Sequence, residues 1–236
     1  MSAQGASRRQ RGKPGRNVTV AGVIAAALLV GGAVAVGNRS GGGDGDRKDG
    51  SVPYSTGKFT VARAGVPATA KGDAYRVETE NGSGIDPDQA AAEVARILAS
   101  PRGWSHHGEH TFRQVTDDTA GLVIRIATPR TTDTICGRSG LDTHGEVNCR
   151  VGTDVMVNLK RWQQGSPEFD GPLTDYRALI INHEVGHWTG HGHETCPGKG
   201  RPAPAMMQQI DGLKGCVANA WPYDAKGRYL GGPSVP

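Results

Sequence analysis

The spacing of apolar and polar residues predicts a domain that combines short strands with two helices. Two early segments, Phe59–Ala64 and Ala74–Glu80, are rich in β-forming residues and are bounded by glycine and proline, as strands commonly are. Further strands are expected at Phe112–Val115, at Leu122–Ala127 and at Asp154–Leu159. In the last of these segments the apolar residues alternate, which is typical of a strand with one buried face.

The first helix is predicted from its end signals as much as from its apolar residues. Asp86 is a favourable N-cap, Pro87 suits the first helical position, and Gln89 completes a capping pattern. Pro101 marks the end, because proline cannot continue a helix. Four apolar residues recur at helical spacing between these signals and predict one buried face: Ala91, Val94, Ala95 and Leu98.

A second helix is predicted over Leu173–Gly190, with Thr174 as its N-cap. The resulting order is strand, helix, several strands and helix, without regular β-α alternation. This order favours an α+β fold over a doubly wound sheet. The folded domain is expected to span 58–236, and the chain contains no internal repeat.

The N-terminal region has the pattern of a membrane anchor. Val18–Gly37 is a run of twenty residues without a charge, long enough to cross a bilayer core of roughly 30 Å. Basic residues precede this run, which predicts a cytoplasmic tail at 1–17 and an extracellular chain after Asn38. Residues 38–57 are rich in Gly, Asp, Ser and Arg and predict a flexible linker.

Two other export signals stay open for the same region. A cleaved signal peptide is one alternative, because Ala33-Val34-Ala35 offers small residues at cleavage spacing. The protein would then be secreted. A twin-arginine signal at Arg8-Arg9 is the other, although the apolar residues that should follow it are missing. All three interpretations place the folded domain outside the cell.

Charge and composition exclude one class of partner. The 236-residue chain has 27 Lys and Arg and 23 Asp and Glu. Five of the basic residues lie within the first 37 positions, which contain no acid, so 22 basic and 23 acidic residues remain for the rest. A folded part this close to neutral predicts no binding of nucleic acid. Nothing in the sequence indicates an oligomer, and we expect a monomer.

The four cysteines, Cys136, Cys149, Cys196 and Cys216, predict two disulfides in an exported domain. Three pairings are possible, and nearest-neighbour pairing is preferred because it closes two short loops. Zinc ligation by thiolates is the competing interpretation, but the sequence has no Cys-x-x-Cys spacing.

The strongest chemical signal lies within the second predicted helix. His183 and His187 are four residues apart, so both imidazoles can point at one ion from the same helix face. Zinc suits such nitrogen ligands. Glu184 is placed to reach a zinc-bound water rather than the zinc, and there it would act as general base.

A third ligand is expected just beyond the helix. Gly190 permits a left-handed turn that would end the helix and swing His193 back towards the first two histidines. Three protein ligands leave a fourth position for water, which distinguishes a catalytic zinc site from a structural one. His191 is an alternative third ligand because it lies only two residues from His193.

These residues resemble the metzincin group of zinc peptidases, whose pattern is H-E-x-x-H-x-x-G-x-x-H. The resemblance implies a twisted, mainly antiparallel sheet packed on two helices, with the active-site helix followed by a methionine-containing turn. It implies zinc ligation by His183, His187 and His193 and a hydrophobic floor from Met206 or Met207. It also implies that one strand, expected at Asp154–Leu159, forms the sheet edge that aligns an extended substrate.

Two details refine this resemblance. Glu194, directly after the third histidine, is similar to the astacin and serralysin branches, but no tyrosine follows the methionines. Tyr223 is a candidate for that missing tyrosine. From about Lys58 onward the chain also resembles an uncharacterised actinobacterial family described as membrane-anchored zinc-dependent metalloproteases.

Other residues that could bind ligands are interpreted more simply. His106, His107 and His110 could form a second metal site, but they lie among polar residues without helical spacing and favour a solvated loop. The tryptophans Trp162, Trp188 and Trp221 are expected to pack rather than to bind a ligand.

The sequence therefore predicts an extracellular zinc metallopeptidase that hydrolyses peptide bonds in a protein or peptide substrate. A zinc amidase acting on cell-wall peptides would use the same residues. An interaction module that keeps zinc without turnover is the alternative from another class, and an intact Glu184 argues against it.

Overall fold

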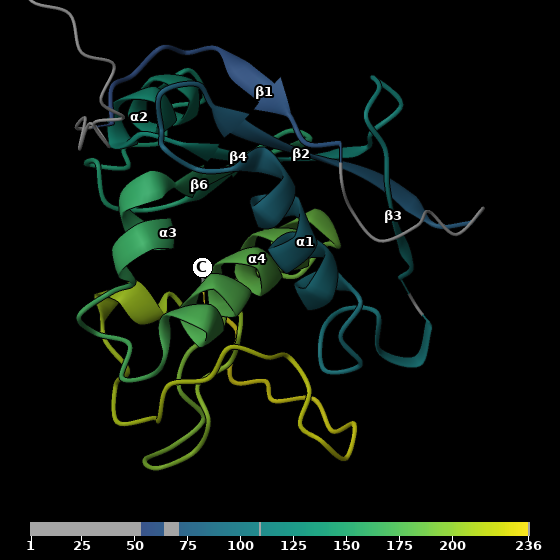
Figure 1. Cartoon of the computed structure of the whole chain (residues 1–236). Coiled ribbons are helices and arrows are strands. Elements are labelled where there is room, and N and C mark those ends of the chain that lie inside the picture. The colour runs from purple at the N-terminus through teal and green to yellow at the C-terminus, as the bar shows by residue number, and fades with distance from the viewer. Residues whose placement is uncertain (1–52, 64–70, 109, 236) are drawn as a thin grey trace, which may run out of the picture. The chain divides into compact units, whose positions relative to one another are not determined.

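A six-stranded sheet forms one layer of the fold (Figure 1). The computed structural model describes residues 53–63, 71–108 and 110–235. The strands are β1 (Phe59–Val61), β2 (Asp73–Glu80), β3 (Phe112–Gln114), β4 (Leu122–Ala127), β5 (Cys149–Val151) and β6 (Asp154–Asn158). Their order across the sheet is β1-β2-β4-β6-β5, and β3 pairs with β2.

The sheet is mixed, whereas a mainly antiparallel sheet was predicted. The central pairs β2–β4 and β4–β6 are parallel, as is β2–β3, and the outer pairs β1–β2 and β5–β6 are antiparallel. Parallel neighbours need a crossover connection. Helical segments lie in both connections between the central strands, so each following strand runs in the same direction as the one before it.

The longer helices are α1 (Pro87–Leu98), α2 (Pro129–Gly137), α3 (Leu159–Gln164) and α4 (Leu173–Trp188), and short 3₁₀ turns lie at His106–Gly108 and Gln209–Asp211. The N-cap prediction for α1 is confirmed, because the Asp86 carboxylate accepts hydrogen bonds from the backbone of Asp88 and Gln89. The predicted apolar face of α1 is buried. The fold class is α+β, as predicted.

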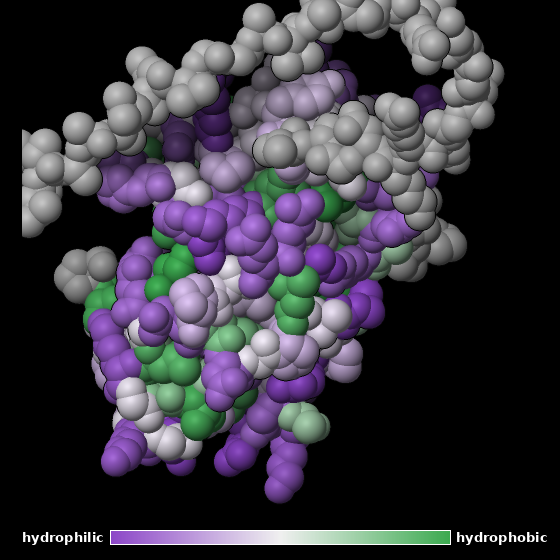
Figure 2. Space-filling view, turned by 60° about the vertical axis from the view of Figure 1, so that its left-hand side comes forward, coloured by the Kyte–Doolittle hydropathy of each residue, from purple (hydrophilic) through white to green (hydrophobic). Residues whose placement is uncertain are grey.

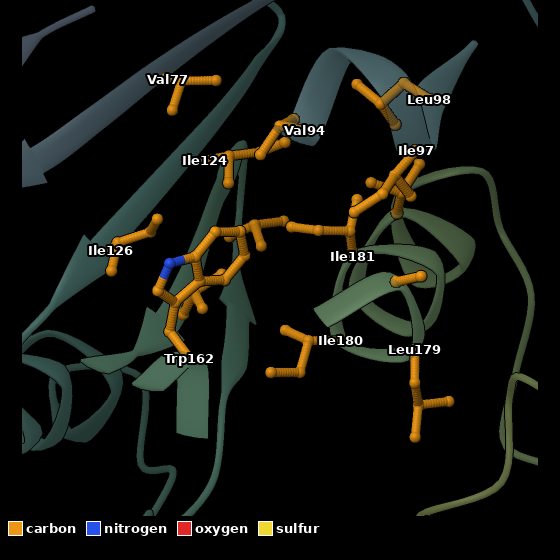
Figure 3. Close-up of a cluster of buried hydrophobic side chains, with 14 of the residues drawn as sticks. Val77, Val94, Ile97, Leu98, Ile124, Ile126, Trp162, Leu179, Ile180 and Ile181 are labelled. Carbon is orange, nitrogen blue, oxygen red and sulfur yellow. The ribbon is translucent and has the colours of Figure 1, made fainter. Parts of the chain in front are cut away.

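The main core lies between the sheet and helices α1 and α4 (Figure 3). Val77, Ile124 and Ile126 reach it from the strands, while Val94 and Ile181 reach it from the two helices. All five side chains are buried completely or nearly so. This packing fixes α4 against one face of the sheet, so the helix that carries the histidine motif has a rigid support.

Trp162, Trp188 and Trp221 pack in or against the main core, as the sequence predicted. Trp162 and Trp221 belong to the main core, being 2% and 8% exposed. Trp188 packs against that core and donates a hydrogen bond to the Gly121 carbonyl.

Two predicted details of α4 and β6 are wrong. Helix α4 begins one residue before Thr174, and Pro172 is its N-cap, because the extended backbone of Pro172 presents its carbonyl to the amides of Asp175 and Tyr176. Strand β6 is also not a sheet edge, since β4 and β5 flank it on both sides. The edge strand next to β6 is β5, whose three residues are too few to produce a recognisable alternation.

The start of the folded unit is fixed by a buried carboxylate. Glu80 is 1% exposed and accepts hydrogen bonds from the backbone of Thr56 and Gly57, from both the backbone and the hydroxyl of Thr128, and from the hydroxyl of Thr131. The chain therefore joins the fold before Lys58. A buried carboxylate with this many donors stabilises the junction of β2, α2 and the entering chain.

Both predicted disulfides are present in the preferred nearest-neighbour pairing. Cys136 in α2 is bonded to Cys149 in β5. Cys196 is bonded to Cys216 in the C-terminal region. No cysteine is left for thiolate ligation of a metal.

The chain divides into two units, Met1–Asp49 and Gly50–Pro236. The predicted anchor at 18–37, its cytoplasmic tail and most of the predicted linker lie outside the described residues. Among the described residues, no helix has the length and apolar character needed to cross a bilayer.

Candidate metal centre

Three histidines from α4 and the loop after it meet at one point. His183 and His187 lie one turn apart on α4, and His193 approaches them from beyond its C-terminus. One ring nitrogen from each lies within 4.8 Å of the others. The Nε2 atoms of His187 and His193 are 3.1 Å apart. The predicted trio is thus brought together, and it is the one such cluster of His, Cys, Asp or Glu within the described residues.

The return of His193 depends on the way α4 ends. Gly190 has a φ of 97°, as the sequence predicted for a left-handed helix stop. Its amide donates to the His187 carbonyl, and the amide of His191 donates to the Gly186 carbonyl. These two bonds define a Schellman motif, which reverses the chain just after the helix. A residue with a Cβ would be strained at this φ.

Main-chain carbonyls hold two of the imidazoles in place. The Nδ1 atom of His183 lies 2.9 Å from the Ala205 carbonyl, and that of His187 lies 2.9 Å from the His191 carbonyl. A carbonyl can only accept, so each Nδ1 carries the proton. This tautomer leaves Nε2 as the lone-pair donor on both rings, which is the arrangement metal-binding histidines usually have.

All three imidazoles are kept neutral. Burial lowers the pKa of His183 to about 3, and repulsion from His187, whenever that ring is protonated, acts in the same direction. Burial also lowers the pKa values of His187 and His193. A neutral imidazole is the form that donates its lone pair to a metal, so no proton has to be removed first. The donor set therefore fits a zinc ion.

Glu184 is placed beside this cluster. Its side chain is 6% exposed and lines, together with His183, a pocket of about 80 Å³. Burial raises the pKa of Glu184 to about 8, and the positive charge of Arg150 opposes that shift. The carboxyl group is thus held in an apolar setting next to the point where the three histidines meet.

The pocket beside Glu184 has a mixed lining, with Gln208 and Gln209 among its polar side chains. Tyr176, Leu179 and Ile180 come from α4. Met207 and Ile210 come from the segment that crosses below the helix. The apolar part of this lining suits an apolar group of modest size.

The two methionines predicted as alternative floors have different positions. Met206 is fully buried in the main core, and its sulfur lies so close to Gly186 that a Cβ there would be 2.3 Å away. Met207 is 3% exposed and packs with Ala203 and Cys216. Met206 therefore supports the helix from below, while Met207 borders the pocket.

The C-terminal segment also supports the third histidine. The Glu194 carboxylate accepts hydrogen bonds from the Tyr229 hydroxyl at 2.9 Å and from the Gly232 amide at 3.0 Å. The amide of Val235 donates to the His193 carbonyl. Sequence reasoning noted Glu194 but missed Tyr229, because the contact spans 35 residues without any local pattern.

The other predicted candidates lie elsewhere. The ring of His191 stacks on Trp104 at 4.1 Å, and its side chain is not part of the cluster. His106 stacks on Tyr223 at 4.2 Å. His110 lies 3.3 Å from the Asp73 carboxylate. The contribution of His191 to the site is its carbonyl, which sequence reasoning did not consider.

Fold and site together define an α+β domain that carries three convergent histidines and an adjacent buried glutamate. The chain belongs to the family described as "Protein of unknown function (DUF3152)", whose model matches residues 48–224. No curated protein and no solved structure matches the chain.

Proposed function

We propose that this protein is a zinc-dependent hydrolase of peptide bonds with a metzincin-like domain. The observation that carries the proposal is the convergence of His183, His187 and His193 beside the buried carboxyl of Glu184. A site built only to bind zinc for structure has no use for a carboxyl in that position. The buried Met206 beneath the helix supports the comparison with metzincins.

The three histidines would hold zinc through their ring nitrogens. The carbonyls of Ala205 and His191 fix two of the rings, so little ordering is needed when the metal binds. When bound, zinc supplies Lewis acidity, which polarises a carbonyl group and makes water a nucleophile near neutral pH.

Glu184 is the proposed proton carrier. Its carboxylate takes a proton from the attacking water, and the protonated carboxyl then gives that proton to the leaving amine. Its burial keeps bulk water away from the transfer. Burial raises the pKa of this carboxyl to about 8. A bound zinc and Arg150 would both favour the ionised form that the first of these steps requires, because both are positively charged.

The substrate would lie as an extended chain along β5. This strand is one edge of the sheet, and a peptide strand can be added on its outer side. Val147 and Asn148, just before β5, line the pocket beside His183 and Glu184. A peptide on β5 would therefore pass the proposed zinc site and place one apolar side chain in that pocket.

An extracellular position agrees with the disulfides. Two cystines persist in an oxidising compartment and are uncommon in the cytosol. Anchoring through residues 18–37 remains a prediction from the sequence.

The function is tested with the full-length chain and two variants. Glu184→Gln removes the proton carrier, whereas His191→Ala changes a neighbouring histidine outside the cluster. The proposal expects zinc in all three proteins, and hydrolysis by the wild type and His191→Ala only. A loss of roughly 10²- to 10⁴-fold is expected for Glu184→Gln, because general acid–base catalysis typically contributes that much.

The substrate panel should contain proteins, peptides and cell-wall peptide amides. Hydrolysis of the last group alone would make the enzyme an amidase. Zinc binding with no difference between wild type and Glu184→Gln on any substrate would favour a non-catalytic interaction module.

The surface in Figure 2 gives little support to the interaction module. On the described part of this face, hydrophobic residues form separate groups among hydrophilic ones, without the broad apolar surface that a stable partner would cover.

A further inference from the structure

An arginine on the edge strand faces the proposed catalytic centre. Arg150 is the middle residue of β5 and is exposed. Strand β5 lies against α4, the helix that carries His183, Glu184 and His187. Sequence reasoning missed this residue, because β5 itself was not predicted.

The register of β5 shows which way Arg150 points. Arg150 is paired with Val155 of β6, and residues paired across two strands project to the same face of the sheet. Val155 is completely buried in the core that the sheet shares with α4. Cys149 is paired with Met156 and is bonded to Cys136 on the opposite face. Arg150 therefore projects from the sheet edge on the side of α4.

The residues just before Arg150 place it close to the pocket. Val147 and Asn148 line that pocket together with His183 and Glu184. Arg150 follows Asn148 by two residues, which is roughly 6–7 Å along an extended chain. Arg150 therefore lies beside the pocket, displaced along β5 from the residues that line it.

Most of the hydrogen-bonding capacity of Arg150 remains available to a ligand. One of its terminal nitrogens donates to the Gly152 carbonyl at 2.7 Å. A guanidinium has five N–H donors in a planar fork that matches a carboxylate. Within the described residues, no Asp or Glu forms an ion pair with it.

We propose that Arg150 is a specificity residue that binds a carboxylate of the substrate, so that the preferred substrates are acidic peptides. This proposal rests on the proposed peptidase function. The bound peptide places an apolar side chain in the pocket lined by Leu179 and Met207, and an Asp or Glu side chain further along β5, beside Arg150. One cation in a nearly neutral domain suits a single carboxylate rather than a polyanion.

Cleavage preference is the first test. The full-length wild type is incubated with a peptide library in which one position at a time carries Glu or its neutral isostere Gln, and kcat/KM is compared. At one position a preference for Glu on the order of 10-fold is expected, since an exposed charge pair is weakened by solvent. Arg150→Glu should abolish this preference and favour Lys there, while Arg150→Lys should retain part of it.

The matched control is Arg130→Glu, which makes the same charge change at an exposed position of α2. It should keep the preference of the wild type. Equal cleavage of Glu and Gln peptides by the wild type would overturn the proposal, as would an unchanged preference in Arg150→Glu.

A binding measurement separates this proposal from the peptidase function. Fluorescently labelled peptides carrying either Glu or Gln are titrated into zinc-loaded Glu184→Gln protein, with and without Arg150→Glu. Tighter binding of the Glu peptide, lost in the double variant and weakened by salt, supports the role of Arg150 even if no cleavage is found. Equal binding of the two peptides overturns it even if the wild type is an active peptidase.

Discussion

Substitution of Gly186 tests how tightly α4, which carries His183 and His187, packs against the segment that contains Met206. An alanine here would place its Cβ 2.3 Å from the Met206 sulfur and 2.8 Å from Cζ2 of Trp104. Methionine is flexible, but Met206 is 0% and Trp104 4% exposed, so neither can move aside into solvent. The helix itself would gain, because alanine is favoured over glycine in a helix interior by about 0.5–1 kcal/mol.

Overpacking of a filled core costs about 1–3 kcal/mol. Subtracting the helical gain leaves about 0–2.5 kcal/mol, and we expect Gly186→Ala to lower the free energy of unfolding by an amount in the upper half of this range, because both contacting side chains are confined in the core. Zinc affinity should fall as well, because Met206 follows Ala205, whose carbonyl holds the His183 ring. Urea denaturation gives the free energy of unfolding, and competition with a chromogenic chelator gives the zinc affinity.

Gly137→Ala is the matched control for this substitution. Gly137 ends α2, and nothing lies within 4 Å of the position its Cβ would take. Alanine should be neutral or slightly stabilising there. If Gly186→Ala is as stable as the control and binds zinc normally, Met206 does not fill the space beneath the helix and the packing argument is wrong.

Three further predictions concern the supports of the site. Burial raises the pKa of Glu80, but hydrogen bonds from Thr131 and other donors outweigh it, so the folded-state pKa lies below the ordinary 4.5. The stability that Glu80 contributes is therefore present above pH 4.5 and is lost as the pH falls through the folded-state pKa. Glu80→Gln should lower the free energy of unfolding by about 1–3 kcal/mol at neutral pH. Urea denaturation at several pH values should also show a weaker acid dependence for this variant than for the wild type. Replacing Cys196 and Cys216 by serine should cost about 3 kcal/mol in urea denaturation and weaken zinc binding. Loss of the Cys136–Cys149 disulfide should also lower stability but leave zinc binding unchanged. Glu194→Ala should release the C-terminal segment, visible as faster amide hydrogen exchange there, and an unchanged exchange rate would contradict the role given to the carboxylate.

The parts of the fold that the sequence predicted have strong local signals. Asp86 and Pro87 define the start of α1 through bonds within one turn. Gly190 defines the end of α4 through the one backbone conformation that glycine adopts readily. The three histidines could be grouped in advance, because helical spacing and this turn decide where their rings lie.

The parts that were missed depend on contacts distant in sequence. Helix α2 contains Thr131, Thr132 and Thr134, whose helix propensity is low, and the structure holds it through the bond from Cys136 to β5. Strand β5 is only three residues long and exists because it pairs with β6. The directions of β2, β4 and β6 likewise follow from crossover connections rather than from any pattern within the strands. Missing β5 also concealed Arg150.

Zinc content tests the central claim most directly. The full-length wild type, His193→Ala and His191→Ala are purified in parallel, equilibrated with zinc, and measured by elemental analysis after gel filtration. The account predicts one zinc per chain in the wild type and in His191→Ala, and a greatly weakened zinc affinity in His193→Ala. A wild type that holds no zinc with its disulfides intact would contradict the account, and equal zinc in all three proteins would show that His193 is not a ligand.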